Sequence, residues 1–304
     1  MTAPSQPDNE WRVHAALLGA QTGFALFPIF GKLALATIPA MVLAALRATA
    51  ASALFAVFRH ATCRERLAAA DRRAILLFAL LGVSVNQVLF ILGLSLTTAI
   101  NTTILNAMIP VYTLTAAALL GRERLSARAV SALLLAGAGA LLLLRAESFD
   151  WRNDFFRGDL LLIGNGIAYA FYLVLSRPIL ARYEALTVVS GVFTYGTLPI
   201  LAAALPSLRR FTASHVTPVG WSSLAAVIVF CTVLPYFWNS WALARTHASR
   251  VALYIFVQPL IASAVAVAVL GERLTARTAA AALLILSGLA ISVSPRRLPA
   301  RPIP

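Results

Sequence analysis

Long apolar runs separated by short polar segments extend along almost the whole chain. A helix of about 20 apolar residues is long enough to cross the hydrocarbon core of a bilayer, which is roughly 30 Å thick. The pattern therefore predicts ten membrane-spanning helices, over residues 13–33, 39–58, 74–95, 99–120, 127–144, 159–179, 186–205, 218–243, 248–270 and 276–294. The segments between them are too short for a separate soluble domain.

One half of the sequence repeats the other. Residues 97–144 align without a gap on residues 246–293, a shift of 149 positions that places Pro110 on Pro259. Each copy has an apolar run with a central proline, a short polar corner and a second apolar run. A weaker similarity relates the first helices of the two halves, where GAQTGFALFPIFGK aligns with GNGIAYAFYLVLSR. Internal repeats determine the architecture, and this one predicts two related halves of five helices.

The composition places the chain among membrane proteins. Hydrophobic residues make up 60% of it and charged residues only 12%, far from the balance of soluble domains. The formal net charge of +14 raises the alternative of a nucleic-acid partner. Most arginines, however, lie in short loops between apolar runs, as expected when a bilayer excludes charges. The lipid bilayer is thus the expected surrounding, and no nucleic acid is expected to bind.

The distribution of basic residues predicts the orientation of the chain. With the N-terminus inside, the cytoplasmic segments hold 16 basic residues and the outer segments hold eight, and Arg47 lies within a span. This bias places both termini in the cytoplasm. Because five is an odd number, the second half enters the membrane from the opposite side, which makes the repeat inverted. In many transporters with inverted repeats the substrate site lies at the midplane between the halves.

The motifs resemble those of the drug/metabolite transporter superfamily, in its ten-helix EamA-type form, which includes bacterial amino-acid and metabolite exporters. The matching residues are Pro110 with GRERL from Gly121, Pro259 with GERL from Gly271, the segment GDLLLIGNGIAYAFYLVLSR, and Arg47. The resemblance implies alternating-access transport of small metabolites, often amino-acid export and sometimes drug efflux. It also implies a central cavity surrounded by helices 1, 3, 4, 6, 8 and 9, and a bacterial inner (plasma) membrane location.

The predicted fold class is therefore an all-α integral membrane protein, with ten transmembrane helices as two inverted five-helix repeats around a central cavity. The predicted organisation is a cytoplasmic N-terminal tail (1–12), a first EamA-like repeat (13–145), a connecting loop (146–158), a second EamA-like repeat (159–294) and a cytoplasmic C-terminal tail (295–304).

Polar side chains within the predicted spans are candidates for the cavity wall, because they are costly in a bilayer unless they face protein or water. They fall on the helices that the resemblance places around the cavity. The predicted substrate-binding residues are Gln21, Asn86, Asn106, Asn165, Tyr169, Tyr172, Trp238, Asn239, Tyr254 and Gln258. The alternative is that these groups only form hydrogen bonds between helices.

Five further residues are predicted to be structural or gating. Pro110 and Pro259 each remove an amide from the middle of a span, which predicts a static kink or a hinge. Glu123 and Glu272 lie at the polar corners, where they are expected to pair with nearby arginines. Arg47 lies near the middle of the second span, where it could contact an anionic substrate group or carbonyl groups of the other half.

Several absences narrow the function. No Asp or Glu lies in the interior of a span, so proton coupling cannot be assigned, and no GxxxxGK[ST] motif suggests ATP as a partner. Neither HExxH nor an embedded aspartate pair suggests an enzyme, and the two cysteines form no disulfide or metal pattern. We expect a small-molecule transporter that is not an enzyme and needs no cofactor. Multidrug efflux, and an intramembrane enzyme or scaffold, are the alternatives; substrate, direction and oligomeric state stay open.

Overall fold

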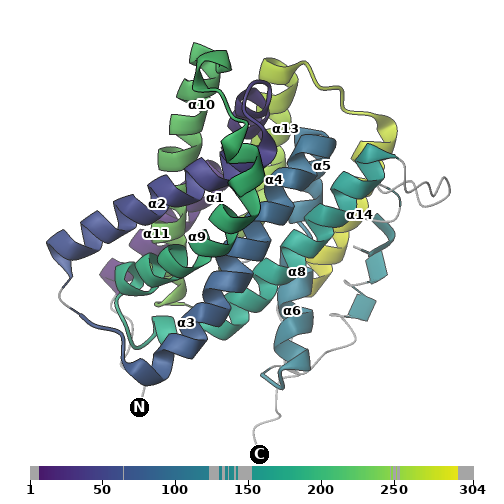
Figure 1. Cartoon of the computed structure of the whole chain (residues 1–304). Helices are drawn as coiled ribbons and strands as arrows, with labels where there is room; N and C mark the ends of the chain where they lie inside the picture. Colours follow the sequence, from purple (N-terminus) through teal and green to yellow (C-terminus); the bar gives the residue numbers. More distant parts are fainter. Residues whose placement is uncertain are drawn as a thin grey trace, which may run out of the picture.

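The computed structural model describes residues 7–63, 65–122, 153–246 and 254–293, together with 130, 131, 134, 135, 137–139, 142, 248 and 251. Within this described part every regular element is a helix (Figure 1). The longer helices are α1 (Pro7–Leu35), α2 (Ala40–Thr62), α3 (Arg72–Ala79), α4 (Asn86–Leu96), α5 (Ala99–Asn106), α6 (Ile109–Leu119), α8 (Asp154–Leu180), α9 (Ala185–Arg209), α10 (Pro218–Ile228), α11 (Leu234–Leu243), α13 (Val257–Leu270) and α14 (Ala276–Val293).

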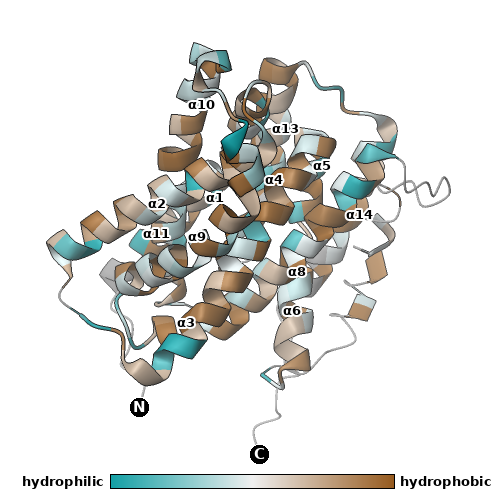
Figure 2. Ribbon diagram, in the orientation of Figure 1, coloured by the Kyte–Doolittle hydropathy of each residue, from teal (hydrophilic) through white to brown (hydrophobic). Residues whose placement is uncertain are grey.

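Seven helical stretches of the described chain are long and apolar enough to cross a membrane. They are Glu10–Leu35, Ala40–Thr62, Ala69–Leu96, Ala99–Leu119, Asp154–Leu180, Ala185–Arg209 and Pro218–Leu243, and Val257–Leu270 and Ala276–Gly288 are shorter apolar helices. These nine match nine of the predicted spans. The remaining span, 127–144, lies largely outside the described residues. Figure 2 shows hydrophilic residues gathered mainly near helix ends and corners, as expected when the helix middles are in a bilayer.

Local sequence signals explain where the helices begin and end. Thr98 and Thr217 are N-caps, because their hydroxyl groups accept the backbone N–H of the third residue on, in α5 and α10 respectively. Gly121 and Gly271 follow α6 and α13 with φ of 67° and 65°, a left-handed backbone that glycine adopts without steric cost. Thr275 caps the start of α14 in the same way, since its Oγ1 accepts the N–H of Thr278 at 3.1 Å.

The two halves are packed into one another. Helices α4 and α6 pack on α8. In the equivalent arrangement of the other repeat, α11 and α13 pack on α1. Helix α2 also packs on α9. Two π-helical turns, Leu80–Val85 before α4 and Val229–Val233 before α11, begin 149 residues apart, the same shift as in the sequence repeat. The predicted fold class is confirmed, and the cavity described below lies where helices of both halves meet.

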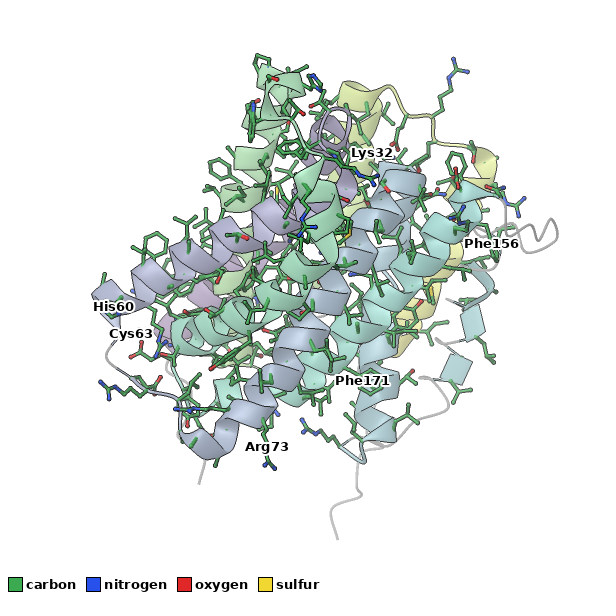
Figure 3. The ribbon with its side chains drawn as sticks, in the orientation of Figure 1. Lys32, His60, Cys63, Arg73, Phe156 and Phe171 are labelled. Atoms are coloured by element: carbon green, nitrogen blue, oxygen red, sulfur yellow. The ribbon has the colours of Figure 1, made fainter. Side chains whose placement is uncertain are left out.

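The two ends of the bundle carry different charged groups. Lys32 lies near the upper end in Figure 3 and Arg73 at the lower end. At the lower end, the segment after α2 contacts the segment after α8: Arg182 and Tyr183 both bind the carboxylate of Asp71, each at 2.7 Å. These contacts join the loop between the second and third spans to the loop between the sixth and seventh.

Candidate functional site

A cavity lies inside the bundle, with a volume of about 60 Å³ open to water-sized molecules. Its wall comes from both halves of the chain. The lining residues are Gln21, Phe24, Phe27, Arg47, Asn86, Phe90, Asn106, Ile109, Asn165, Tyr169, Leu173, Tyr236, Asn239, Val251, Ile255 and Gln258. Seven of the ten predicted substrate-binding residues are therefore brought to one cavity, together with Arg47.

A chain of hydrogen bonds joins four of these side chains across four helices. Nε2 of Gln258 donates to Oε1 of Gln21 at 2.5 Å, and Nε2 of Gln21 donates to Oδ1 of Asn239 at 3.3 Å. Nδ2 of Asn239 donates to the hydroxyl oxygen of Tyr169 at 3.2 Å. All four side chains are buried. The chain links α13, α1, α11 and α8, so one polar network crosses the boundary between the halves.

A second set of hydrogen bonds surrounds Asn86. Its Oδ1 accepts from the hydroxyl of Tyr236 at 3.2 Å, and its backbone carbonyl accepts from Nδ2 of Asn165 at 2.8 Å. The Tyr236 hydroxyl also lies 3.3 Å from the carbonyl oxygen of Gly82, in the π turn before α4. Because π turns free carbonyl groups from the regular α-helical pattern, they often occur at functional sites. Tyr236 is a cavity residue that was not among the predicted site residues.

Arg47 is buried in the middle of α2, with 2% of its surface exposed. Its Nε donates to Oγ1 of Thr232 at 2.7 Å, and its guanidinium carbon lies 4.0 Å from the centre of the Phe27 ring. Its Nη1 has no hydrogen-bond partner in the described chain. Among the described residues of the cavity wall there is no aspartate or glutamate, and Arg47 is the single charged side chain.

Both predicted prolines coincide with interruptions of their spans. Helix α5 ends at Asn106, and α6 begins at Ile109 with Pro110 in its first turn. Pro259 lies in the first turn of α13, directly after the 3₁₀ turn Tyr254–Phe256. Each proline lacks the N–H that would continue the helix through it. The breaks place irregular backbone beside the cavity, where a membrane protein can accommodate it.

Three predicted cavity residues lie away from the wall. Tyr172 is buried behind it, stacked on Tyr169 with ring centroids 5.7 Å apart. The ring of Trp238 packs against Gly19. The hydroxyl of Tyr254 is hydrogen-bonded to the imidazole of His14, near the start of α1. Polar character indicated the helices that reach the cavity, but it did not determine, for these three residues, the direction in which the side chain points.

Glu272 connects the halves at the upper end of the bundle. Its carboxylate accepts the backbone N–H of Ala99 at 2.7 Å and of Ile100 at 2.9 Å, at the N-terminus of α5. A negative charge is favourable there because the first N–H groups of a helix have no partner within it. Glu272 thus contacts the opposite half of the protein, and its predicted pairing with a neighbouring arginine stays a prediction. Its repeat equivalent, Glu123, lies outside the described residues.

The fold and the site together define a class: a multi-pass α-helical membrane protein whose two repeats enclose a cavity lined by apolar and amide side chains. The chain belongs to the EamA-like transporter family, which matches residues 11–145 and again 156–294. It is therefore a membrane transporter of the drug/metabolite transporter superfamily.

Similar proteins agree with this assignment. An uncharacterized transporter of Archaeoglobus fulgidus is 25% identical over 256 residues, covering 84% of this chain and 89% of the relative. A protein of Salmonella typhimurium named "Probable amino-acid metabolite efflux pump" is 28% identical over 190 residues, 60% of this chain and 63% of that protein. A solved crystal structure superposes with a TM-score of 0.66 at 18% identity, covering 95% of this chain and 98% of the other, which supports the fold.

Proposed function

We propose that this protein is an alternating-access transporter that exports amino acids or related small metabolites across a bacterial inner membrane, with both termini in the cytoplasm. The observation that carries the proposal is the cavity inside the bundle, whose mainly apolar wall holds several amide side chains and Arg47 and combines helices of both repeats. A site shared by two inverted halves can be exposed to either side of the membrane when one half rocks against the other.

The size of the cavity favours small metabolites over large drugs. A buried water needs roughly 10–15 Å³ of such space, so a cavity of about 60 Å³ holds only a few water molecules. Drug-sized ligands occupy pockets of about 300–1,000 Å³. An amino acid therefore requires much less expansion of this cavity than a drug does. The name of the Salmonella typhimurium relative points to the same substrate class.

The two proline breaks and the Glu272 contact suggest how access alternates. The contact of Glu272 with Ala99 and Ile100 closes the upper end, which the positive-inside bias makes the outer side. Releasing it would let α5 move away from α13, with Pro110 and Pro259 as hinges. The polar chain from Gln258 to Tyr169 would have to rearrange in the same step, because it spans both halves.

Uptake by reconstituted proteoliposomes tests the proposal. Labelled amino acids are supplied as a panel, with and without a pH gradient, and the variant Asn239→Ala is compared with Ser222→Ala, an exposed control on α10. Saturable uptake of one class by wild type and Ser222→Ala, reduced in Asn239→Ala, supports amino-acid transport through this cavity. If folded wild type stays at the level of empty liposomes, amino-acid transport fails, and uptake of bulky drugs instead establishes the drug-efflux alternative.

A further inference from the structure

The guanidinium of Arg47 lies in a cavity whose described wall contains no acidic side chain. A buried cation is costly unless an anion and a full set of hydrogen bonds accompany it. Here Nε is bonded to Thr232 and one face lies on Phe27, while the buried Nη1 has no hydrogen-bond partner among the described residues. Thr232 is itself neutral and donates to the carbonyl of Val227 at 2.7 Å. The described cavity wall thus supplies an anion-binding group and no anion.

Helix packing alone does not require an arginine at this position. Helices α2 and α9 are the matching second helices of the two repeats, and they begin at Ala40 and Ala185. Arg47 is the eighth residue of α2, and the eighth residue of α9 is Val192, which is 1% exposed. The second repeat fills the equivalent position with a small apolar side chain. Arg47 therefore breaks the symmetry of the halves and places one positive charge on the cavity.

One other polar group of the wall points to a ligand. Gln21, Asn239, Tyr169, Asn86 and Tyr236 take part in the hydrogen bonds described above. Oδ1 of Asn106, in contrast, is buried without a hydrogen-bond partner in the described chain, and 8% of the residue is exposed. An unpaired buried acceptor costs free energy that a ligand N–H or O–H would recover.

We propose that Arg47 and Asn106 form the polar subsite for the substrate, in which Arg47 binds a carboxylate and Asn106 accepts a hydrogen bond from an amino or hydroxyl group. The inference rests on the proposed transport function and specifies its substrate class as small α-amino or α-hydroxy acids. A planar guanidinium matches a carboxylate in geometry and charge, and such charge-assisted bonds are the strong ones. Phe24, Phe27 and Phe90 provide an apolar surface for the rest of the molecule.

Two ligand series test the subsite without any mutation. Leucine is compared with isoamylamine, which lacks the carboxylate, and with 4-methylpentanoate, which lacks the amine; phenylalanine, phenethylamine and 3-phenylpropanoate form the second series. Binding is measured as thermal stabilisation of the purified protein, and transport as uptake by proteoliposomes. We expect removal of the carboxylate to weaken binding about 30-fold or more, and removal of the amine about 2-fold to 10-fold.

Variants locate the effect at Arg47. Arg47→Gln is expected to bind 4-methylpentanoate no more tightly than isoamylamine, and 3-phenylpropanoate no more tightly than phenethylamine. Arg47→Lys is expected to keep part of the preference for the two carboxylates. Arg245→Gln is the matched control, because Arg245 also lies 4.0 Å from an aromatic ring centre, that of Trp241, but is exposed outside the cavity. Asn106→Leu is expected to remove the advantage of leucine over 4-methylpentanoate. If Arg47→Gln does not fold, Arg47→Lys and the wild-type series still decide the outcome.

The results separate this inference from the transport proposal. Three results would overturn the subsite. Wild type could bind the acid and the amine of a series with equal affinity, no carboxylate could stabilise the protein, or chloride could stabilise it as much as the carboxylates do. Amino-acid uptake with an unchanged KM in Arg47→Gln would overturn it while leaving the transport proposal standing. Carboxylate binding that depends on Arg47, without uptake, would support the subsite and contradict amino-acid transport.

Discussion

Glu272 caps a helix that belongs to the opposite half of the protein: its Oε1 accepts the N–H of Ala99 at 2.7 Å. The residues are 173 positions apart, and Lys32 of α1 lies close enough to attract the same carboxylate. Three spans therefore meet at one side chain. The contact combines two charge-assisted hydrogen bonds with the positive end of α5, so it holds the segment after α13 against the start of α5.

Replacing Glu272 by Gln should loosen this end of the bundle. The glutamine amide keeps one acceptor oxygen but carries no negative charge. We therefore expect the contact with Ala99 and Ile100 to be less stable by about 1–3 kcal/mol. The measurement is the rate at which Asn101→Cys, placed beside the contact, reacts with a membrane-impermeant maleimide. The rate should rise in Glu272→Gln and stay near the starting value in Glu272→Asp. An unchanged rate in Glu272→Gln would show that the contact does not control access.

Asn239 is the central member of the polar chain across the halves. The variant Asn239→Leu leaves the Tyr169 hydroxyl and Nε2 of Gln21 without partners, which costs about 1–3 kcal/mol for each buried polar group. We expect kcat/KM for uptake to fall about 10-fold or more. The measurement is the initial rate of uptake at several substrate concentrations, with Ser222→Ala as the control. Wild-type kinetics in Asn239→Leu would mean that the network is not needed for transport.

Cys63, at the left of Figure 3 beside His60, offers a native probe of orientation. It lies just beyond α2, while Cys231, the other cysteine, is buried within a span. With the predicted topology, an impermeant maleimide should label Cys63 in inside-out vesicles and not in intact cells. Cys63→Ser provides the blank. Labelling of intact cells at Cys63 would reverse the predicted orientation.

The labelling of Cys63 should also depend on pH. Partial burial raises the pKa of its thiol, and so does the hydrogen bond that the thiol donates to Oε2 of Glu184, at 2.7 Å. Since the thiolate is the reactive form, a raised pKa leaves less of it near pH 7, and the rate should increase as the pH rises. Glu184→Gln removes the neighbouring charge and should increase the rate at neutral pH. The same rate in both proteins at every pH would contradict this explanation.

Glycine permits the close contact between α1 and the π turn of the eighth span. A Cβ at Gly23 would lie 2.4 Å from the carbonyl oxygen of Phe230 and from Cγ of Pro235. Gly23→Ala should therefore destabilise the protein by about 1–3 kcal/mol, as overpacking does. Gly137→Ala is the control, because no described atom lies within 4 Å of its Cβ position. Melting temperatures in detergent should fall for Gly23→Ala only, and an equal melting temperature for both would contradict the contact.

The sequence alone was sufficient for the architecture and the family. Apolar runs of bilayer length can satisfy their backbone hydrogen bonds in lipid only as helices, and a gapless repeat requires related halves. The same reasoning found most of the polar side chains of the cavity wall, because residues such as Gln21, Asn165 and Gln258 are too costly in lipid to face outward. Intramembrane Arg47 was recognisable for the same reason.

Only the tertiary structure decided which polar groups are paired and which are free. Side-chain spacing gives a residue's position on its own helix, but the rotation of that helix against its neighbours depends on packing across the halves. Trp238 and Asn239 are adjacent in sequence, yet one packs on Gly19 and the other lines the cavity. The contact between Glu272 and Ala99, like the unpaired Nη1 of Arg47, arises from residues far apart in the chain, so no local pattern could predict it.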